Sequence, residues 1–211
     1  MRSFNFSLYV ITDNRYLRNR SLPDLVEAAL RGGAAAVQLR NKEADTADFI
    51  EEGLQLLPIT RKYKVPLIVN DRIDVAVEID ADGVHLGQED ASPEEARSIL
   101  GMSKIIGVSV HSVTQAMEAL EFPVDYLGAG SIYPSKTEPR EAIGVQTLER
   151  ICKSVGIPVI AIGGITVDKV EEVMKNGASG VAVISDVWDT DDVEERVREY
   201  ASELEAVKRS R

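Results

Sequence analysis

Residues 175–183 read KNGASGVAV, a stretch in which a helix end, a glycine turn, small residues and an apolar strand follow one another. The same order occurs in residues 31–39, RGGAAAVQL, and in residues 78–86, EIDADGVHL. Each stretch is typical of a join from a helix into a strand that is buried on both faces, as strands are in parallel sheets. Three such joins in one chain predict repeated β/α units.

Beyond these joins, short apolar runs alternate with amphipathic segments along the whole chain. The expected strands cover residues 8–11, 35–39, 66–69, 83–86, 105–110, 126–133, 158–162 and 180–184. The expected helices cover residues 22–33, 44–62, 73–79, 92–100, 112–120, 147–154, 166–176 and 191–207. Eight β/α pairs in 211 residues, without a linker rich in Pro, Ser and Gly, predict one domain over residues 1–211. The predicted fold class is α/β, a single (β/α)8 TIM barrel, and an open doubly wound sheet is the alternative.

The charge and composition exclude several classes of partner. Acidic residues outnumber basic ones 35 to 24, which argues against general nucleic-acid binding because that needs a basic surface. No apolar run reaches the ~18 residues of a membrane span. The single cysteine, Cys152, excludes an internal disulfide and is expected to be a packing residue. With no signal-peptide pattern, we expect a cytoplasmic location; the sequence leaves the oligomeric state open and allows a homo-oligomer.

Polar side chains follow the second expected strand, where function is expected in a barrel of this class. Gln38, Arg40 and Lys42 lie at positions i, i+2 and i+4, so in an extended chain they share one face. An amide and two cations on one face favour capture of a multiply charged anion, with Arg40 as a fork and Lys42 as a point charge. The alternative is a solvated strand end.

Acidic and amide groups follow the third and fourth expected strands. Asn70 and Asp71 end one strand, and Asp90 follows the next. Two carboxylates on neighbouring strands repel each other unless a cation joins them, and oxygen ligands suit Mg²⁺, which typically takes one or two carboxylates and substrate phosphates. Asp71 and Asp90 are therefore the candidate metal ligands; the alternative is a pair of solvated loop acids.

The fifth expected strand ends in a serine and a histidine. Ser109 and His111 share a face, and His111 could act as an acid or base, although a lone histidine can also be structural. His85 lies within the fourth strand between Val84 and Leu86 and is expected to pack in the core. No GxSxG nucleophile elbow is present, which disfavours a serine hydrolase.

The last two strands end in small residues that can expose backbone N–H groups. Gly163 and Gly164 follow the seventh strand, and Ile184 and Ser185 follow the eighth. Donors at these two positions form the recurring phosphate site of this fold. The mouth of the barrel would then bind two anions, which indicates a pair of substrates: one with a metal-bound diphosphate and one with a single phosphate.

Several motifs, taken together, resemble the thiamine-phosphate synthase family. They are YVITD, VQLRNK, VPLIVNDRIDVA, ADGVHLGQED, IIGVSVHS, DYLGAGSIYP, IPVIAIGGIT and GASGVAVIS, and they span about residues 8–190 in the same order. The resemblance implies a (β/α)8 barrel that couples 4-amino-2-methyl-5-hydroxymethylpyrimidine diphosphate with a thiazole phosphate, releasing diphosphate and forming thiamine phosphate.

The resemblance also implies roles for individual residues and a Mg²⁺ cofactor. Arg40, Lys42 and Asn70 would hold the diphosphate, Asp71 and Asp90 would hold Mg²⁺, Gln38 and Ser109 would contact the pyrimidine and its leaving group, and Gly164, Ile184 and Ser185 would hold the thiazole phosphate. Arg40, Lys42, Ser109 and Lys136 are the candidate catalytic residues.

The loop SIYPSKTEPREAIG, residues 131–144, departs from the pattern that the resemblance implies. The family usually has Thr-x-Thr-Lys after the proline, with a lysine that helps to bind diphosphate, whereas this chain has Ser135, Lys136, Thr137 and Glu138. We expect Ser135 and Thr137 to face the substrates and Lys136 to replace the usual lysine. The alternative is an impaired diphosphate site.

Two other functions stay open on sequence alone. A sister family, the thiazole tautomerases, shares the fold, needs no metal and implicates a histidine that matches His111. That family tends to lose the Asn-Asp and Gln-x-Asp acids, which are intact here. The second alternative is a barrel that binds a phosphate ligand without turnover, since a fold alone does not imply catalysis.

Overall fold

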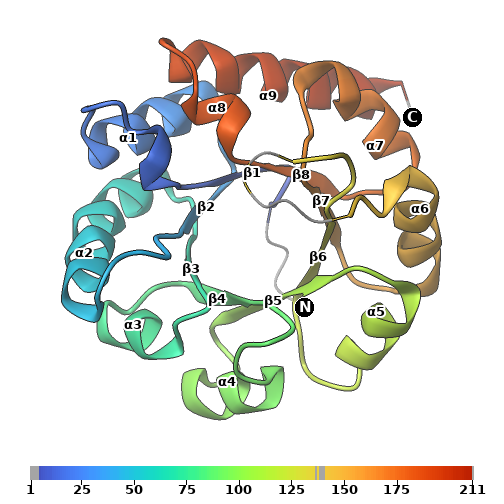
Figure 1. Cartoon of the computed structure of the whole chain (residues 1–211), viewed down its shortest axis with the longest axis horizontal. Coiled ribbons are helices and arrows are strands. Elements are labelled where there is room, and N and C mark those ends of the chain that lie inside the picture. The colour runs from blue at the N-terminus through green and yellow to red at the C-terminus, as the bar shows by residue number, and fades with distance from the viewer. Residues whose placement is uncertain (1–4, 136, 138–140, 211) are drawn as a thin grey trace.

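The computed structural model describes residues 5–135, 137 and 141–210. Eight parallel strands form a closed barrel in the order of the sequence, and helices surround it (Figure 1). The strands are β1 Leu8–Ile11, β2 Ala36–Leu39, β3 Leu67–Asn70, β4 Gly83–Leu86, β5 Ile105–Val110, β6 Tyr126–Gly130, β7 Val159–Ile162 and β8 Gly180–Val183. Because β1 pairs with both β2 and β8, the barrel prediction is confirmed and the open sheet is excluded.

The helices follow the strands, as the sequence predicts, with small shifts at their ends. They are α1 Leu22–Gly32, α2 Thr46–Tyr63, α3 Ile73–Glu78, α4 Pro93–Leu100, α5 Val113–Ala119, α6 Gly144–Ser154, α7 Val170–Lys175, α8 Ser185–Trp188 and α9 Val193–Arg209, with the 3-10 turns η1 Asn14–Tyr16 and η2 Val167–Lys169. The predictions missed η1 and α8, which are too short to show hydrophobic periodicity.

Local signals explain where the first helix begins and ends. The Ser21 hydroxyl accepts a hydrogen bond from the N–H of Asp24, as an N-cap does, and Gly33 ends the helix in the left-handed conformation with φ of 108°. A Cβ at Gly32 would lie 2.8 Å from the Cβ of Val197, so the small residue lets α1 pack closely against α9. This contact joins the first and last helices around the closed barrel.

Two hydrophobic layers result from strands that are buried on both faces. The outer layer lies between the strands and the helices and includes Val37, Val69 and Leu127. The inner layer fills the barrel and includes Tyr9 and Tyr126. Side chains fill the inner layer only partway along the strands, so a cavity remains at their carboxyl ends.

The sixth strand is shorter than predicted. The prediction carried it to Tyr133, whereas β6 ends at Gly130. Ile132 and Tyr133 still donate backbone hydrogen bonds to the end of β7, but the backbone oxygens of Ser131 and Ile132 accept from Ile143 and Gly144. The chain thus leaves the barrel wall at Ser131 and begins the loop that returns at residue 143.

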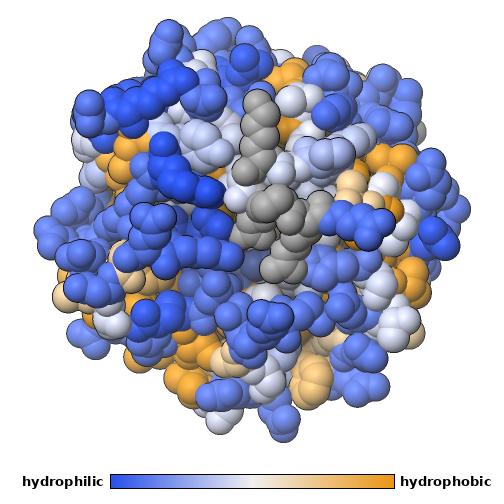
Figure 2. Space-filling model, viewed as in Figure 1, coloured by the Kyte–Doolittle hydropathy of each residue, from blue (hydrophilic) through white to orange (hydrophobic). Residues whose placement is uncertain are grey.

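The outer surface agrees with the composition. The face in Figure 2 is largely hydrophilic, and its hydrophobic side chains lie in separate patches. Cys152 is half-buried, and burial raises the pKa of its thiol to about 11, as expected for a packing residue. Among the described residues, no helix is both long and apolar enough to cross a bilayer.

Candidate active site

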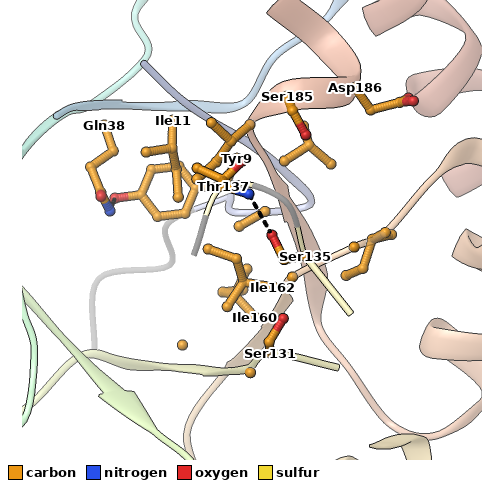
Figure 3. Close-up of a pocket in the computed structure, with 18 of the residues that line it drawn as sticks. Tyr9, Ile11, Gln38, Ser131, Ser135, Thr137, Ile160, Ile162, Ser185 and Asp186 are labelled. Atoms are coloured by element: carbon orange, nitrogen blue, oxygen red, sulfur yellow. Dashed lines mark hydrogen bonds between the residues drawn. The ribbon is translucent and has the colours of Figure 1, made fainter. Parts of the chain in front are cut away.

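A cavity of about 460 Å³ lies inside the barrel at the carboxyl ends of the strands (Figure 3). It is lined by every predicted substrate-binding residue except Lys42, namely Gln38, Arg40, Asn70, Ser109, Ser135, Thr137, Gly164, Ile184 and Ser185. His111 lines it as well. Residues that are up to 147 positions apart in the sequence, from Gln38 to Ser185, therefore meet at one site.

Arg40 is held at the cavity by a buried acid that the sequence reading missed. Its guanidinium donates to Asp13 Oδ2 at 3.1 Å, and both residues are less than a tenth exposed. Burial opposes ionisation of Asp13, but hydrogen bonds from Arg15 and the charge of Arg40 outweigh it and lower the pKa of that carboxyl. An ionised Asp13 fixes the orientation of Arg40, as a ligand-binding guanidinium requires.

Asp71 and Asp90 adjoin each other beside the cavity. Burial, followed by a hydrogen bond and the negative charge of Asp90, raises the pKa of Asp71 to about 7. The charges of Lys42 and Arg40 act in the opposite direction, which places both cations close to the acids. The two predicted metal ligands and the two predicted diphosphate-binding cations are thus neighbours.

The donor set fits Mg²⁺. Two adjoining carboxylates match the one or two carboxylates that typically hold Mg²⁺, with substrate phosphates as the remaining ligands. In the described part of the chain, no group of three or more His, Cys, Asp and Glu side chains forms a complete metal cage. The pair therefore suits a metal that is bound jointly with a phosphate substrate.

A chain of hydrogen-bonded side chains crosses the interior beneath the cavity. Gln38 Nε2 donates to Tyr9 Oη at 2.9 Å, and Tyr9 Oη lies 3.1 Å from Tyr126 Oη. His85 Nδ1 lies 2.9 Å from Tyr126 Oη, and His85 Nε2 lies 2.9 Å from Ser109 Oγ. Burial lowers the pKa of His85 to about 4. His85 lies inside the barrel, but it lines the cavity and is hydrogen-bonded at both ring nitrogens instead of packing in the core as predicted.

Strands β7 and β8 provide the opposite wall of the cavity. Gly163 and Gly164 have φ of 98° and 63°, a conformation that favours glycine. The N–H of Gly164 donates to no other described residue, and Ser185 begins a helix, so its N–H has no acceptor in that helix. Lys169, which the sequence reading also missed, lines the cavity and donates to Gly164 O at 2.9 Å.

The loop after β6 closes one side of the cavity. Tyr16 Oη lies 3.4 Å from Thr137 Oγ1, and the N–H of Thr137 donates to Ser135 Oγ at 3.3 Å (Figure 3). Both predicted loop hydroxyls line the cavity. The predictions for Lys136 and Glu138 lie outside the described residues.

His111 is tied to the barrel wall. Its Nδ1 contacts the backbone oxygen of Gly130, and its N–H donates to Gln115 Oε1 at 2.7 Å. Because the ring approaches a backbone carbonyl, Nδ1 carries its proton in this arrangement. The contact fixes the orientation of the ring at the edge of the cavity, and an acid–base role of His111 stays a prediction.

The closed (β/α)8 barrel carries a cluster of cations and acids on one side of its mouth and the backbone N–H groups of Gly164 and Ser185 on the other, which is where barrel enzymes place their active sites. The profile of a family described as thiamine monophosphate synthase matches residues 8–187. The chain belongs to this family.

Individual relatives agree with this membership. The chain is 44% identical to a thiamine-phosphate synthase of Clostridium acetobutylicum over 94% of each chain. It is 46% identical to one of Clostridium botulinum over 90% of this chain and 93% of the relative. A solved structure of thiamine phosphate pyrophosphorylase from Pyrococcus furiosus superposes with a TM-score of 0.89, at 44% identity, over 96% of this chain and 97% of the other. The predicted family and barrel are therefore confirmed.

Proposed function

We propose that the protein is a thiamine-phosphate synthase. It couples 4-amino-2-methyl-5-hydroxymethylpyrimidine diphosphate with a thiazole phosphate or its carboxylate and releases thiamine phosphate and diphosphate. The observation that carries the proposal is the pairing of Asp71 with Asp90 next to Arg40 and Lys42. A ligand with a single phosphate needs no such acid pair, whereas a metal-bound diphosphate does.

Each wall of the cavity is proposed to bind one of the two substrates. On the β2–β4 side, Arg40, Lys42 and Asn70 would bind the diphosphate, with Asp71 and Asp90 as the Mg²⁺ ligands. On the β7–β8 side, the N–H groups near Gly164, Ile184 and Ser185 would bind the thiazole phosphate. Gln38 and Ser109 lie deeper in the barrel and would contact the pyrimidine.

The reaction requires charge stabilisation and orientation more than a protein nucleophile. The bond between the pyrimidine methylene carbon and the diphosphate oxygen breaks, and the electron pair leaves with the diphosphate. Arg40, oriented by Asp13, and Lys42 would stabilise the charge that develops there. The thiazole nitrogen then forms the new bond to the methylene carbon, and its fixed phosphate holds it in position for attack. Mg²⁺, when bound, would neutralise charge on the leaving diphosphate.

The loop after β6 would cover the substrates. Ser135 and Thr137 line the cavity and offer hydroxyls to it. Lys136 is proposed to act in place of the family lysine, with Glu138 tolerated. A Lys136→Ala variant should raise the KM for the pyrimidine diphosphate, and an unchanged KM would remove this part of the proposal.

The experiment that tests the function is a coupling assay with matched variants. Purified protein with Mg²⁺ and both substrates should form thiamine phosphate, and Asp90→Asn should lose most of this activity. The matched control is Asp74→Asn, an exposed acid that is paired with Arg72 at 2.5 Å and should keep full activity. Full Mg²⁺-dependent turnover by both Asp71→Asn and Asp90→Asn would contradict the metal assignment.

The location and assembly are proposed on more general grounds. A chain with a single, half-buried cysteine suits a reducing cytoplasm. A homo-oligomer stays a prediction, which native mass spectrometry would test.

A further inference from the structure

The hydrogen-bonded chain beneath the cavity has a defined direction. The Gln38 amide nitrogen can only donate, so the hydroxyl of Tyr9 accepts from it and has its own proton left to give. The partner within reach is Tyr126 Oη at 3.1 Å. Figure 3 shows the amide end of Gln38 beside the hydroxyl of Tyr9.

The direction of hydrogen-bond donation continues from Tyr9 through Tyr126 to His85. Since Tyr126 accepts from Tyr9, its proton is left for His85 Nδ1 at 2.9 Å. A neutral imidazole that accepts at one nitrogen carries its proton on the other, so Nε2 donates to Ser109 Oγ at 2.9 Å. A doubly protonated ring would also donate from Nε2. Ser109 therefore receives a hydrogen bond from His85 in either charge state.

Because the Ser109 hydroxyl accepts from His85, its own proton is available to donate, and the direction left for it is into the cavity. Its hydroxyl has no described hydrogen-bond partner besides His85, and the residue lines the cavity. At the other end of the chain, one N–H of the Gln38 amide donates to Tyr9, and the carbonyl oxygen stays available as an acceptor beside the second N–H. The cavity thus offers a donor from Ser109 and an acceptor from Gln38.

We infer that Tyr126 and Tyr9 are positioning residues that, through His85, set the Ser109 hydroxyl as a hydrogen-bond donor toward the substrate. The inference rests on the proposed function. An aminopyrimidine has ring nitrogens that accept and an amino group that donates, which matches one donor and one acceptor on the protein. The fixed direction would spare the site the cost of reorienting its hydroxyls when the substrate binds.

Two glycines leave room for the rings of Tyr126 and His85. A Cβ at Gly107 would lie 2.1 Å from the ring of Tyr126, and a Cβ at Gly128 would lie 2.9 Å from the ring of His85. Phe6 also packs on Tyr126 with ring centroids 4.5 Å apart. The two glycines and the aromatic contact hold the rings in place, so removing one hydroxyl leaves the packing intact.

The direct test is the tautomer of His85 in the free protein. The chain has two histidines, so ¹⁵N-histidine labelling gives two sets of ring signals, and a His111→Gln variant assigns them. The wild-type protein should carry the proton of His85 on Nε2. A wild-type His85 with its proton on Nδ1 alone would mean that the chain runs the other way, and would overturn the inference.

The kinetic test uses Tyr126→Phe. Without the Tyr126 proton, the single tautomer should give way to a mixture, and kcat/KM for the pyrimidine diphosphate should fall about 10- to 100-fold. The KM for the thiazole phosphate should not change. Tyr9→Phe should give a smaller fall, because Tyr126 still reaches His85. The matched control is Tyr63→Phe, whose hydroxyl donates to Glu27 outside the barrel and should leave both readouts unchanged.

The outcomes separate this inference from the proposed function. If the wild-type protein forms no thiamine phosphate, the function fails, whereas the tautomer can still be read. If the wild type is active but Tyr126→Phe keeps both the tautomer and the kinetic constants, the positioning role is wrong. If Tyr126→Phe does not fold, the kinetic constants of Tyr9→Phe and the tautomer of His85 in the wild type still test the inference.

Discussion

Replacing Asp71 by Asn should stabilise the metal-free protein at alkaline pH. The ordinary pKa of an aspartate is 3.8, and in the fold that of Asp71 is about 7, because of burial and Asp90. A raised pKa means that the folded state holds the proton more tightly than the unfolded chain does. The stability that this provides is complete below pH 3.8 and is lost as the pH rises through about 7.

The size of the effect follows from this difference. A shift from 3.8 to about 7 corresponds to about 4 kcal/mol for a carboxylate that is shielded from water. Asp71 lies at the mouth and is partly reached by solvent, so screening reduces the expected gain to about 1–2 kcal/mol. Asp71 has φ of 63°, which asparagine tolerates well, so the exchange tests the charge without adding backbone strain.

Urea unfolding at pH 8 and pH 5, with and without Mg²⁺, measures the effect. Asp71→Asn should be more stable than wild type at pH 8 without metal, and the difference should shrink at pH 5. Added Mg²⁺ should stabilise the wild type and not the variant. Asp80 is a matched control with φ of 54°, but it pairs with Lys104 and Arg61, so Asp80→Asn should bring no gain. Equal stabilisation of wild type and Asp71→Asn by Mg²⁺ would refute the reasoning.

Three further predictions concern the walls of the cavity. Asp13→Asn should raise the KM for the pyrimidine diphosphate about 10-fold in steady-state assays, because Arg40 loses a charged partner. The pKa of Asp13 is lowered in the fold, so the stability that it contributes is complete above pH 3.8 and is lost as the pH falls through the lowered value. The free energy of unfolding should therefore decrease more steeply below pH 3.8 in the wild type than in Asp13→Asn, as urea unfolding at a series of acidic pH values would show. Lys169→Met should raise the KM for the thiazole phosphate about 10-fold and leave that for the pyrimidine diphosphate unchanged. Gly164→Ala should weaken the same phosphate site, since a Cβ there would lie 2.5 Å from the backbone oxygen of Pro134.

Sequence patterns predicted the barrel because its strands and joins are local features. Buried runs such as β5 were found with their correct ends, Ile105–Val110, since apolar residues and turn residues mark both ends. The predicted end of β6 was wrong because hydrogen bonds between the two ends of the following loop, from residues 143–144 to Ser131 and Ile132, decide where the chain leaves the sheet. Such contacts leave no mark in the local sequence.

The site was predictable where position in the barrel determines the role. Gln38 and Ser109 were found from their place at strand ends, because all strand ends meet at one mouth. Asp13 and Lys169 were missed, since their roles depend on contacts with Arg40 and Gly164 that arise only in three dimensions. Tyr126 lay within the predicted strand 126–133 without a predicted role, and the local signal beside it was the pair of small residues Gly128 and Gly130.

The most direct test of the proposed function is a ³¹P NMR time course on one sample of purified protein, Mg²⁺, pyrimidine diphosphate and thiazole phosphate. We predict that the substrate diphosphate signals give way to free diphosphate while an equal amount of thiamine phosphate forms, and that EDTA stops both changes. Unchanged diphosphate signals, together with conversion of the thiazole phosphate carboxylate between its isomers in a second sample that contains it, would contradict the synthase and make His111 the residue to mutate next.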